Sequence, residues 1–131
     1  MAANDLTDYA FGEWLPFTEA NERALLDALP RSTGVVAIRR TFEGDREPEM
    51  VCVAVGANHS GGVQMRVRQM LHPGRTQSTN LRIRAALEQE DDLELAWALR
   101  ANEAACKELR AKLVNQYERE YGHPLELCPG S

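Results

Sequence analysis

The stretch that decides the fold is residues 34–66, GVVAIRRTFEGDREPEMVCVAVGANHSGGVQMR. Residues 34–38 and 50–56 are apolar, rich in β-branched side chains and bounded by turn-forming residues, so both are expected to be strands. The charged segment between them suits a long hairpin connection. A polar turn containing two glycines follows. Apolar residues then recur at helical spacing, at Val63, Val67, Met70 and Leu71.

The rest of the chain adds helices and one more strand. Thr18 can cap a first helix that ends at Pro30, and Thr79 or Asn80 can cap a short helix that runs through residue 86. Residues 93–99 suit a third strand, and Asn102 can cap a long helix that ends near residue 121. This order of elements predicts a small α/β (α+β) sandwich, in which a three-stranded antiparallel sheet is flanked by helices.

Length and composition indicate one folded domain. The chain has 131 residues, and we expect an acidic arm at 1–13, a domain at 14–126 and a short tail at 127–131. No apolar run approaches the ~20 residues that a membrane span requires, and no leader pattern is present, so we expect a cytoplasmic protein without a membrane partner. The three cysteines have no metal-site spacing, and Cys52 and Cys106 are expected to be buried.

This layout resembles the GIY-YIG nuclease superfamily over roughly residues 14–126. The Gly-Val-Val of residues 34–36 stands where that family has its first signature triplet, and the Ala-Val-Gly of 54–56 stands where it has the second. The resemblance implies a shallow site for phosphodiester cleavage, built from two tyrosines, an arginine and a glutamate that holds a divalent metal. Val36 and Ala54 occupy the two tyrosine positions, and neither side chain can transfer a proton. The resemblance therefore implies a member that has lost its nuclease activity.

Arg66 occupies the family's arginine position and borders the apolar side of its helix. Two alignments compete for the metal-holding position, and they place either Glu108 or Arg110 there. On a helical wheel Arg110 lies beside the apolar face, Glu108 points toward solvent, and Glu103 lies on the site side two turns earlier. We therefore expect Arg110 in the site, where it would repel a metal and, with Arg66, attract an anion.

Two further positions complete the expected ligand-binding set. Gly56 ends the second triplet, and Glu126 stands where the family often has an asparagine. Between residues 50 and 87 there is no Asp or Glu but there are five arginines, which favours a local basic surface on an otherwise acidic chain of net charge −5. The leading hypothesis is a non-catalytic module that binds an anion or the phosphates of a nucleic acid and needs no cofactor.

Two alternatives stay open. One is an enzyme that acts on a small anionic substrate in the same pocket, with Arg66 as a catalytic residue and His59 as the proton carrier. The other is an active nuclease that uses Mg²⁺ or Mn²⁺, with Glu108 or Glu103 as the metal ligand.

Overall fold

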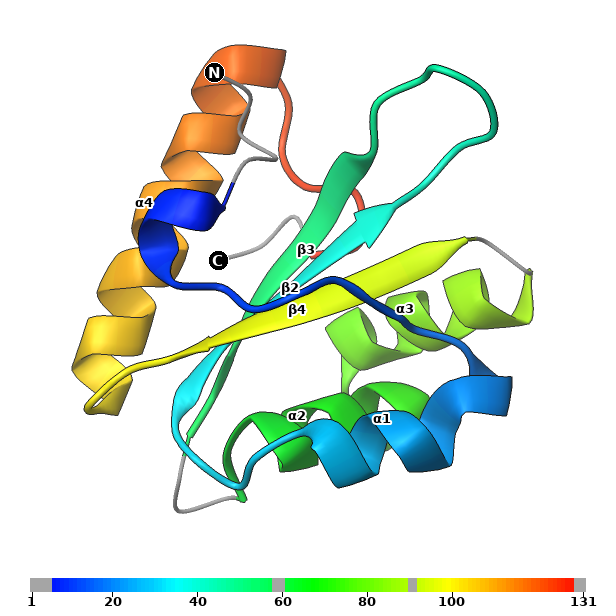
Figure 1. Ribbon diagram of the computed structural model, residues 1–131, viewed down its shortest axis with the longest axis vertical. Coiled ribbons are helices and arrows are strands. Elements are labelled where there is room, and N and C mark those ends of the chain that lie inside the picture. Colours follow the sequence, from blue (N-terminus) through cyan, green and yellow to red (C-terminus); the bar gives the residue numbers. More distant parts are fainter. Residues whose placement is uncertain (1–5, 58–60, 90–91, 129–131) are drawn as a thin grey trace.

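A four-stranded antiparallel sheet forms the centre of the fold, with helices on both sides (Figure 1). The computed structural model describes residues 6–57, 61–89 and 92–128. The strands are β1 (Leu15–Pro16), β2 (Gly34–Arg40), β3 (Glu49–Gly56) and β4 (Leu93–Leu99). Their order in the sheet is β1-β4-β2-β3, so β2 is central and β3 forms an edge. The register places Val36 of β2 between Ala54 of β3 and Trp97 of β4.

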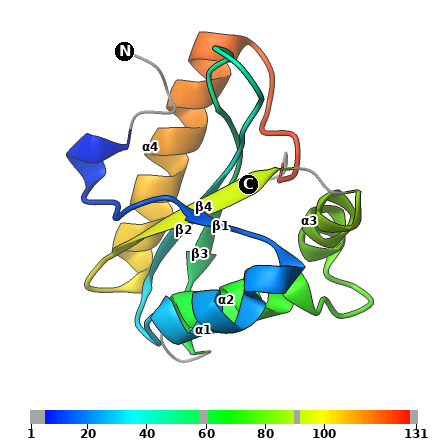
Figure 2. The same cartoon turned by 45° about the vertical axis from the view of Figure 1, so that its right-hand side comes forward.

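The helices form two layers around this sheet. They are α1 (Glu22–Ala28), α2 (Gly62–Leu71), α3 (Ser78–Glu88) and α4 (Glu103–Tyr121), and the short 3₁₀ segments are η1 (Thr7–Tyr9) and η2 (Glu19–Asn21). Figures 1 and 2 show α1, α2 and α3 on one side of the sheet and α4 on the other. Both α2 and α4 contact β2 and β3. Because both faces are covered, β2 and β3 are almost continuously apolar instead of alternating between apolar and polar residues.

The expected strands at 34–38, 50–56 and 93–99 and the expected helix at 62–71 are confirmed. The Thr18 side chain accepts a hydrogen bond at the start of η2, and that of Asn102 does the same at the start of α4. Gly122 ends α4 in the left-handed conformation. The cap expected for α3 is wrong: the helix begins at Ser78, so Thr79 and Asn80 lie inside its first turn.

The expected strand count of three is also wrong, because the sheet has a fourth, very short strand. Leu15 and Pro16 pair with Leu95 and Glu94 of β4. Pro16 has no N–H to donate, which suits the edge position of β1. The coarser expectation, a small α+β domain with an antiparallel sheet, is confirmed. No helix in the described part of the chain is both long and apolar enough to cross a membrane.

Packed residues continue beyond the expected limits of 14 and 126. At the N-terminal side Leu6 is buried, and the hydroxyl of Tyr9 donates to Gln116 on α4. At the C-terminal side Leu127 is buried, and its N–H donates to the carbonyl of Val51 over 3.0 Å. The outer edge of β3 offers unpaired backbone groups, and this segment pairs with some of them.

A close backbone contact joins β3 to α2. A Cβ added to Gly56 would lie 2.7 Å from the carbonyl carbon of Gly62, and one added to Gly62 would lie 2.2 Å from the carbonyl oxygen of Ser32. The first turn of α2 is thus held against the end of β3. This contact sets where the next turn of α2, which carries Arg66, meets the edge of the sheet.

Candidate functional site

A pocket of about 590 Å³ opens at the outer edge of β3, where α2, α3 and α4 meet around residues 53–55. The lining side chains that can bind or react are Arg66, Thr79, Lys107, Arg110 and Cys128. The structure therefore brings Arg66 and Arg110, from helices on opposite faces of the sheet, to one pocket. None of the described residues that line it is an Asp or a Glu.

Arg66 is the least compensated cation of the pocket. Its Nε atom is buried and has no hydrogen-bond partner among the described residues. The side chain also borders two smaller hollows, one beside Gly56 and Gly62 and the other at the first turn of α3. A buried donor without a partner is costly, and an acceptor atom in the pocket would remove that cost.

Arg110 is fixed by the strand that it crosses. Its Nε donates to the carbonyl oxygen of Val53 over 2.8 Å. That oxygen lies on the outer edge of β3, so the bond anchors the guanidinium at the mouth of the pocket. Glu108 is exposed on α4 and lines a different hollow, beside Tyr9 and Arg100. The two residues that the competing alignments offered, Glu108 and Arg110, thus line different hollows. Only Arg110 lines the pocket with Arg66.

The remaining expected site residues are placed elsewhere. Glu103 lies one turn from Lys107 and forms an ion pair with it over 3.0 Å. Glu126 forms an ion pair with Arg40 and is not among the residues that line the pocket. Gly56 lines the adjoining hollow and makes the close backbone contact with α2. His59 lies outside the described residues.

Sequence reasoning missed Cys128, which lines this pocket, and its contact with the buried Cys52. The thiols of Cys52, on β3, and Cys128 are hydrogen-bonded to each other, and the Cys128 sulfur also accepts the N–H of Val53 over 3.2 Å. The Cys52 thiol, the Val53 N–H and the Arg110 guanidinium lower the pKa of Cys128. The hydrogen bond to Cys128 and burial raise the pKa of Cys52. Residues 52 and 128 are far apart in the chain, so no local pattern could have paired them.

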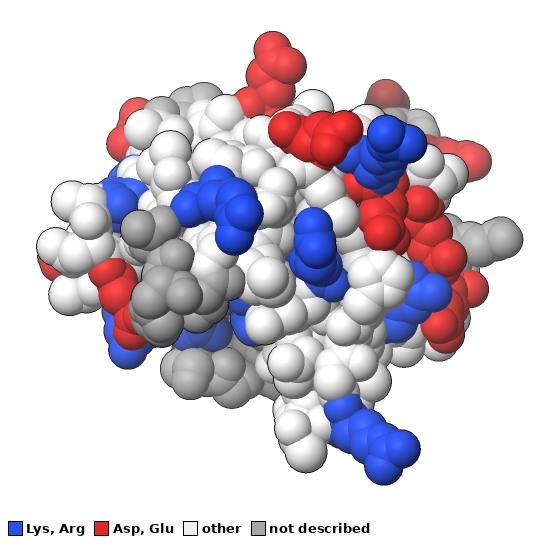
Figure 3. Space-filling view, turned by 90° about the horizontal axis from the view of Figure 1, so that it is seen from below, with Lys and Arg blue, Asp and Glu red and all other residues white. Residues whose placement is uncertain are grey.

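Among the described residues, basic side chains do not form one broad patch on the face of the molecule that is seen from below (Figure 3). Seen from below, basic side chains are spaced apart by uncharged ones, and acidic side chains gather at the margins (Figure 3). Arg84, in the acid-free stretch of sequence, forms ion pairs with Glu19 and Glu88. Arg68 is exposed and belongs to no pocket described here. The acid-free segment thus provides one half-buried cation, Arg66, beside the exposed Arg68, Arg75 and Arg82.

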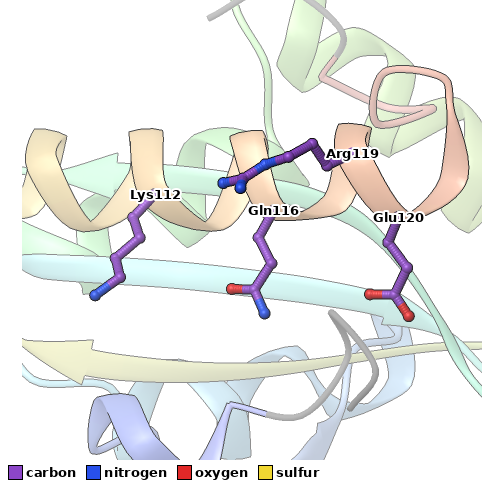
Figure 4. Close-up of a pocket in the computed structure, with 4 residues that line it drawn as sticks. All are labelled: Lys112, Gln116, Arg119 and Glu120. Atoms are coloured by element: carbon purple, nitrogen blue, oxygen red, sulfur yellow. The ribbon is translucent and has the colours of Figure 1, made fainter.

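A second hollow follows the exposed side of α4 and is lined by Lys112, Gln116, Arg119 and Glu120 (Figure 4). All four side chains come from one helix and include both signs of charge. Gln116 already accepts the hydroxyl of Tyr9. This surface lacks the buried, unsatisfied donor found at the β3 edge, so the β3 pocket is the stronger candidate.

Comparisons with known proteins found no match: no protein-family model, no curated protein and no solved structure matches the chain. Within the described residues, no group of three or more His, Cys, Asp or Glu side chains is arranged to hold a metal ion.

Proposed function

We propose that this protein is an anion-binding module, and that the pocket at the β3 edge binds a phosphate group carried by a nucleic acid or by a small molecule. The observation that carries the proposal is the convergence of Arg66, Lys107 and Arg110 in a pocket without a described acidic lining residue. Two guanidinium groups facing one cavity repel each other unless an anion lies between them. Arginine is also the side chain best suited to binding phosphate through two hydrogen bonds.

The sequence resemblance adds a second line of support. The order strand, strand, helix, helix, strand, helix from β2 to α4 agrees with the arrangement expected of a GIY-YIG-like domain. In such a domain the site would be expected beside Arg66. Val36 and Ala54 lack the hydroxyl groups of the signature tyrosines, so we propose binding without cleavage.

The test compares two arginines of the same helix. Binding of a labelled single-stranded oligonucleotide, and separately of inorganic pyrophosphate, is measured for the wild type, Arg66→Gln and Arg68→Gln. Both variants lose one positive charge, but only Arg66 lines the pocket. A hydrogen bond to a charged group contributes about 1.5–3 kcal/mol, so Arg66→Gln is expected to weaken binding about tenfold or more and Arg68→Gln very little.

Salt and metal ions complete the experiment. Oligonucleotide affinity should fall steeply as salt rises, because phosphate contacts release counterions. Equal affinities of the two variants, or no binding of either probe at low salt, would overturn the proposal. Cleavage of the oligonucleotide in Mg²⁺ or Mn²⁺ that is lost in Glu108→Gln or Glu103→Gln would instead establish the nuclease alternative.

A further inference from the structure

Cys52 and Cys128 are far apart in the chain but lie next to each other in the fold. Cys52 lies in the middle of β3, and Cys128 lies on the C-terminal segment that pairs with the outer edge of that strand. Both are buried, but Cys128 also lines the β3 pocket. A small reagent that enters the pocket therefore reaches the sulfur of Cys128 before it reaches that of Cys52.

The surroundings of the two sulfurs differ in a way that suits different chemical roles. The Cys128 sulfur accepts the N–H of Val53 over 3.2 Å and interacts with the Arg110 guanidinium, and both interactions favour the thiolate. Its own thiol reaches the carbonyl oxygens of Val53 and Val51 only over the longer distances of 3.7 and 4.0 Å. The hydrogen bond to Cys128 and burial raise the pKa of Cys52, and both favour its thiol form. One sulfur is thus prepared as a nucleophile, and the other is held beside it as a thiol.

We propose that Cys128 and Cys52 are a redox-active pair, in which Cys128 reacts with a hydroperoxide that enters the pocket and Cys52 then closes a disulfide with it. In the first step the Cys128 thiolate attacks the terminal peroxide oxygen. The S–O bond forms, the O–O bond breaks, and the leaving alkoxide or hydroxide takes a proton to become an alcohol or water.

In the second step Cys52 loses its proton and attacks the sulfur of the Cys128 sulfenic acid. The S–S bond forms, the S–O bond breaks, and the hydroxyl group leaves as water with the proton from Cys52. Two thiols are oxidised and one peroxide is reduced to an alcohol or water, plus one water from the second step. This inference does not depend on the proposed anion binding, because it requires the two sulfurs and Arg110 but no bound phosphate.

The third cysteine is an internal control. Cys106 is buried in α4, lines none of the pockets described here, and has a pKa that burial raises. Its sulfur has neither the edge-strand N–H nor the Arg110 contact that Cys128 has. A difference in reactivity between Cys128 and Cys106 can therefore be measured within one folded protein, without any substitution.

The experiment exposes the folded, full-length wild type to substoichiometric hydrogen peroxide at pH 7, followed by intact mass and peptide mapping. The expected product has lost two hydrogen atoms and contains one cystine that links Cys52 to Cys128, with Cys106 unmodified. In Cys52→Ser, we expect a sulfenic acid at Cys128 that a dione reagent traps. In Arg110→Gln, alkylation of Cys128 should slow by about tenfold for each unit by which the thiol pKa rises above the working pH.

Two results would overturn the inference. One is modification of Cys106 in the wild type at the same rate as Cys128, which would show that the pocket confers no reactivity. The other is a wild type whose Cys128 is oxidised to sulfinic acid without a link to Cys52, which would show that the second sulfur does not resolve the first. Cys106→Ser is the matched control and should form the disulfide at the wild-type rate.

Discussion

At the scale of single residues, Gly62 is the position where a methyl group is least tolerable. It has φ +63°, and an added Cβ would lie 2.2 Å from the carbonyl oxygen of Ser32. The left-handed conformation alone costs a side chain about 1–2 kcal/mol, and the overlap adds to it. We expect Gly62→Ala to lower the free energy of unfolding by ~3 kcal/mol in urea titrations.

Gly44 supplies the control for this prediction. Its φ is +75°, but nothing lies within 4 Å of an added Cβ. Gly44→Ala should therefore cost only the conformational part, about 1–2 kcal/mol. If the two variants lost the same free energy of unfolding, the close contact between Gly62 and Ser32 would make no contribution to the cost of the Gly62 substitution.

The residues of the pocket show what periodicity can and cannot predict. The apolar face of α4 was predictable from its spacing, and that face directs Arg110 toward the sheet and Glu108 away from it. Cys128 was not predictable, because it reaches the pocket through the pairing of Leu127 with Val51 across the whole domain. Local sequence pattern thus predicted which helical side chains line the pocket. Cys128 lines it only because of a long-range backbone pairing that no local pattern indicates.

At the scale of elements, the strands also divide into those that a local sequence pattern predicts and one that forms only through long-range pairing. Three of them are runs of seven or eight residues. The β-branched side chains of β2 and β3 made those two strands predictable, and the alternation in the first half of β4 indicated the third. Leu15–Pro16 is too short to show any pattern and is a strand only because β4 leaves an edge for it. The C-terminal segment likewise has no strand pattern, yet it covers part of the opposite edge.

The C-terminal segment covers part of the β3 edge through Leu127, whose N–H donates to the carbonyl oxygen of Val51. Leu127→Pro removes both the N–H and the buried side chain, whereas Leu127→Ala removes the side chain alone. Leu127→Pro should therefore be less stable than Leu127→Ala by about 1 kcal/mol in urea unfolding. It should also self-associate more in light scattering, because part of the β3 edge is uncovered. Indistinguishable variants would mean that the segment does not protect the edge.

At the scale of the whole molecule, burial on both faces of the sheet makes stability sensitive to alkaline pH. Tyr117 is buried between α4 and the sheet, and its hydroxyl donates to Glu49 over 3.0 Å. Burial and this bond raise the pKa of Tyr117 above its ordinary value of 10.0. Burial also contributes to raised pKa values of Cys52 and Cys106, above the ordinary 9.0. In each case the folded protein keeps a proton that the unfolded chain has lost.

A raised pKa contributes stability that is fully present below the unfolded pKa and is lost as pH rises toward the folded one. Stability should therefore decline from about pH 9, as the unfolded thiols ionise, and more steeply from about pH 10, as unfolded Tyr117 follows. Each group contributes about 1.4 kcal/mol per pH unit to that slope. Cys128, with its lowered pKa, works in the opposite sense up to about pH 9, where the unfolded thiol ionises, and adds nothing to the decline well above that pH.

Tyr117→Phe isolates the contribution of the tyrosine. The variant should be less stable than the wild type by about 1 kcal/mol at pH 7, because the hydrogen bond to Glu49 is lost. Between pH 10 and 11 its unfolding free energy should fall less steeply, by about 1.4 kcal/mol per unit, so the two curves converge. Urea midpoints measured at half-unit steps from pH 7 to 11 test this. Curves that stay parallel throughout would mean that Tyr117 ionises equally easily in both states, which its buried hydroxyl should not allow.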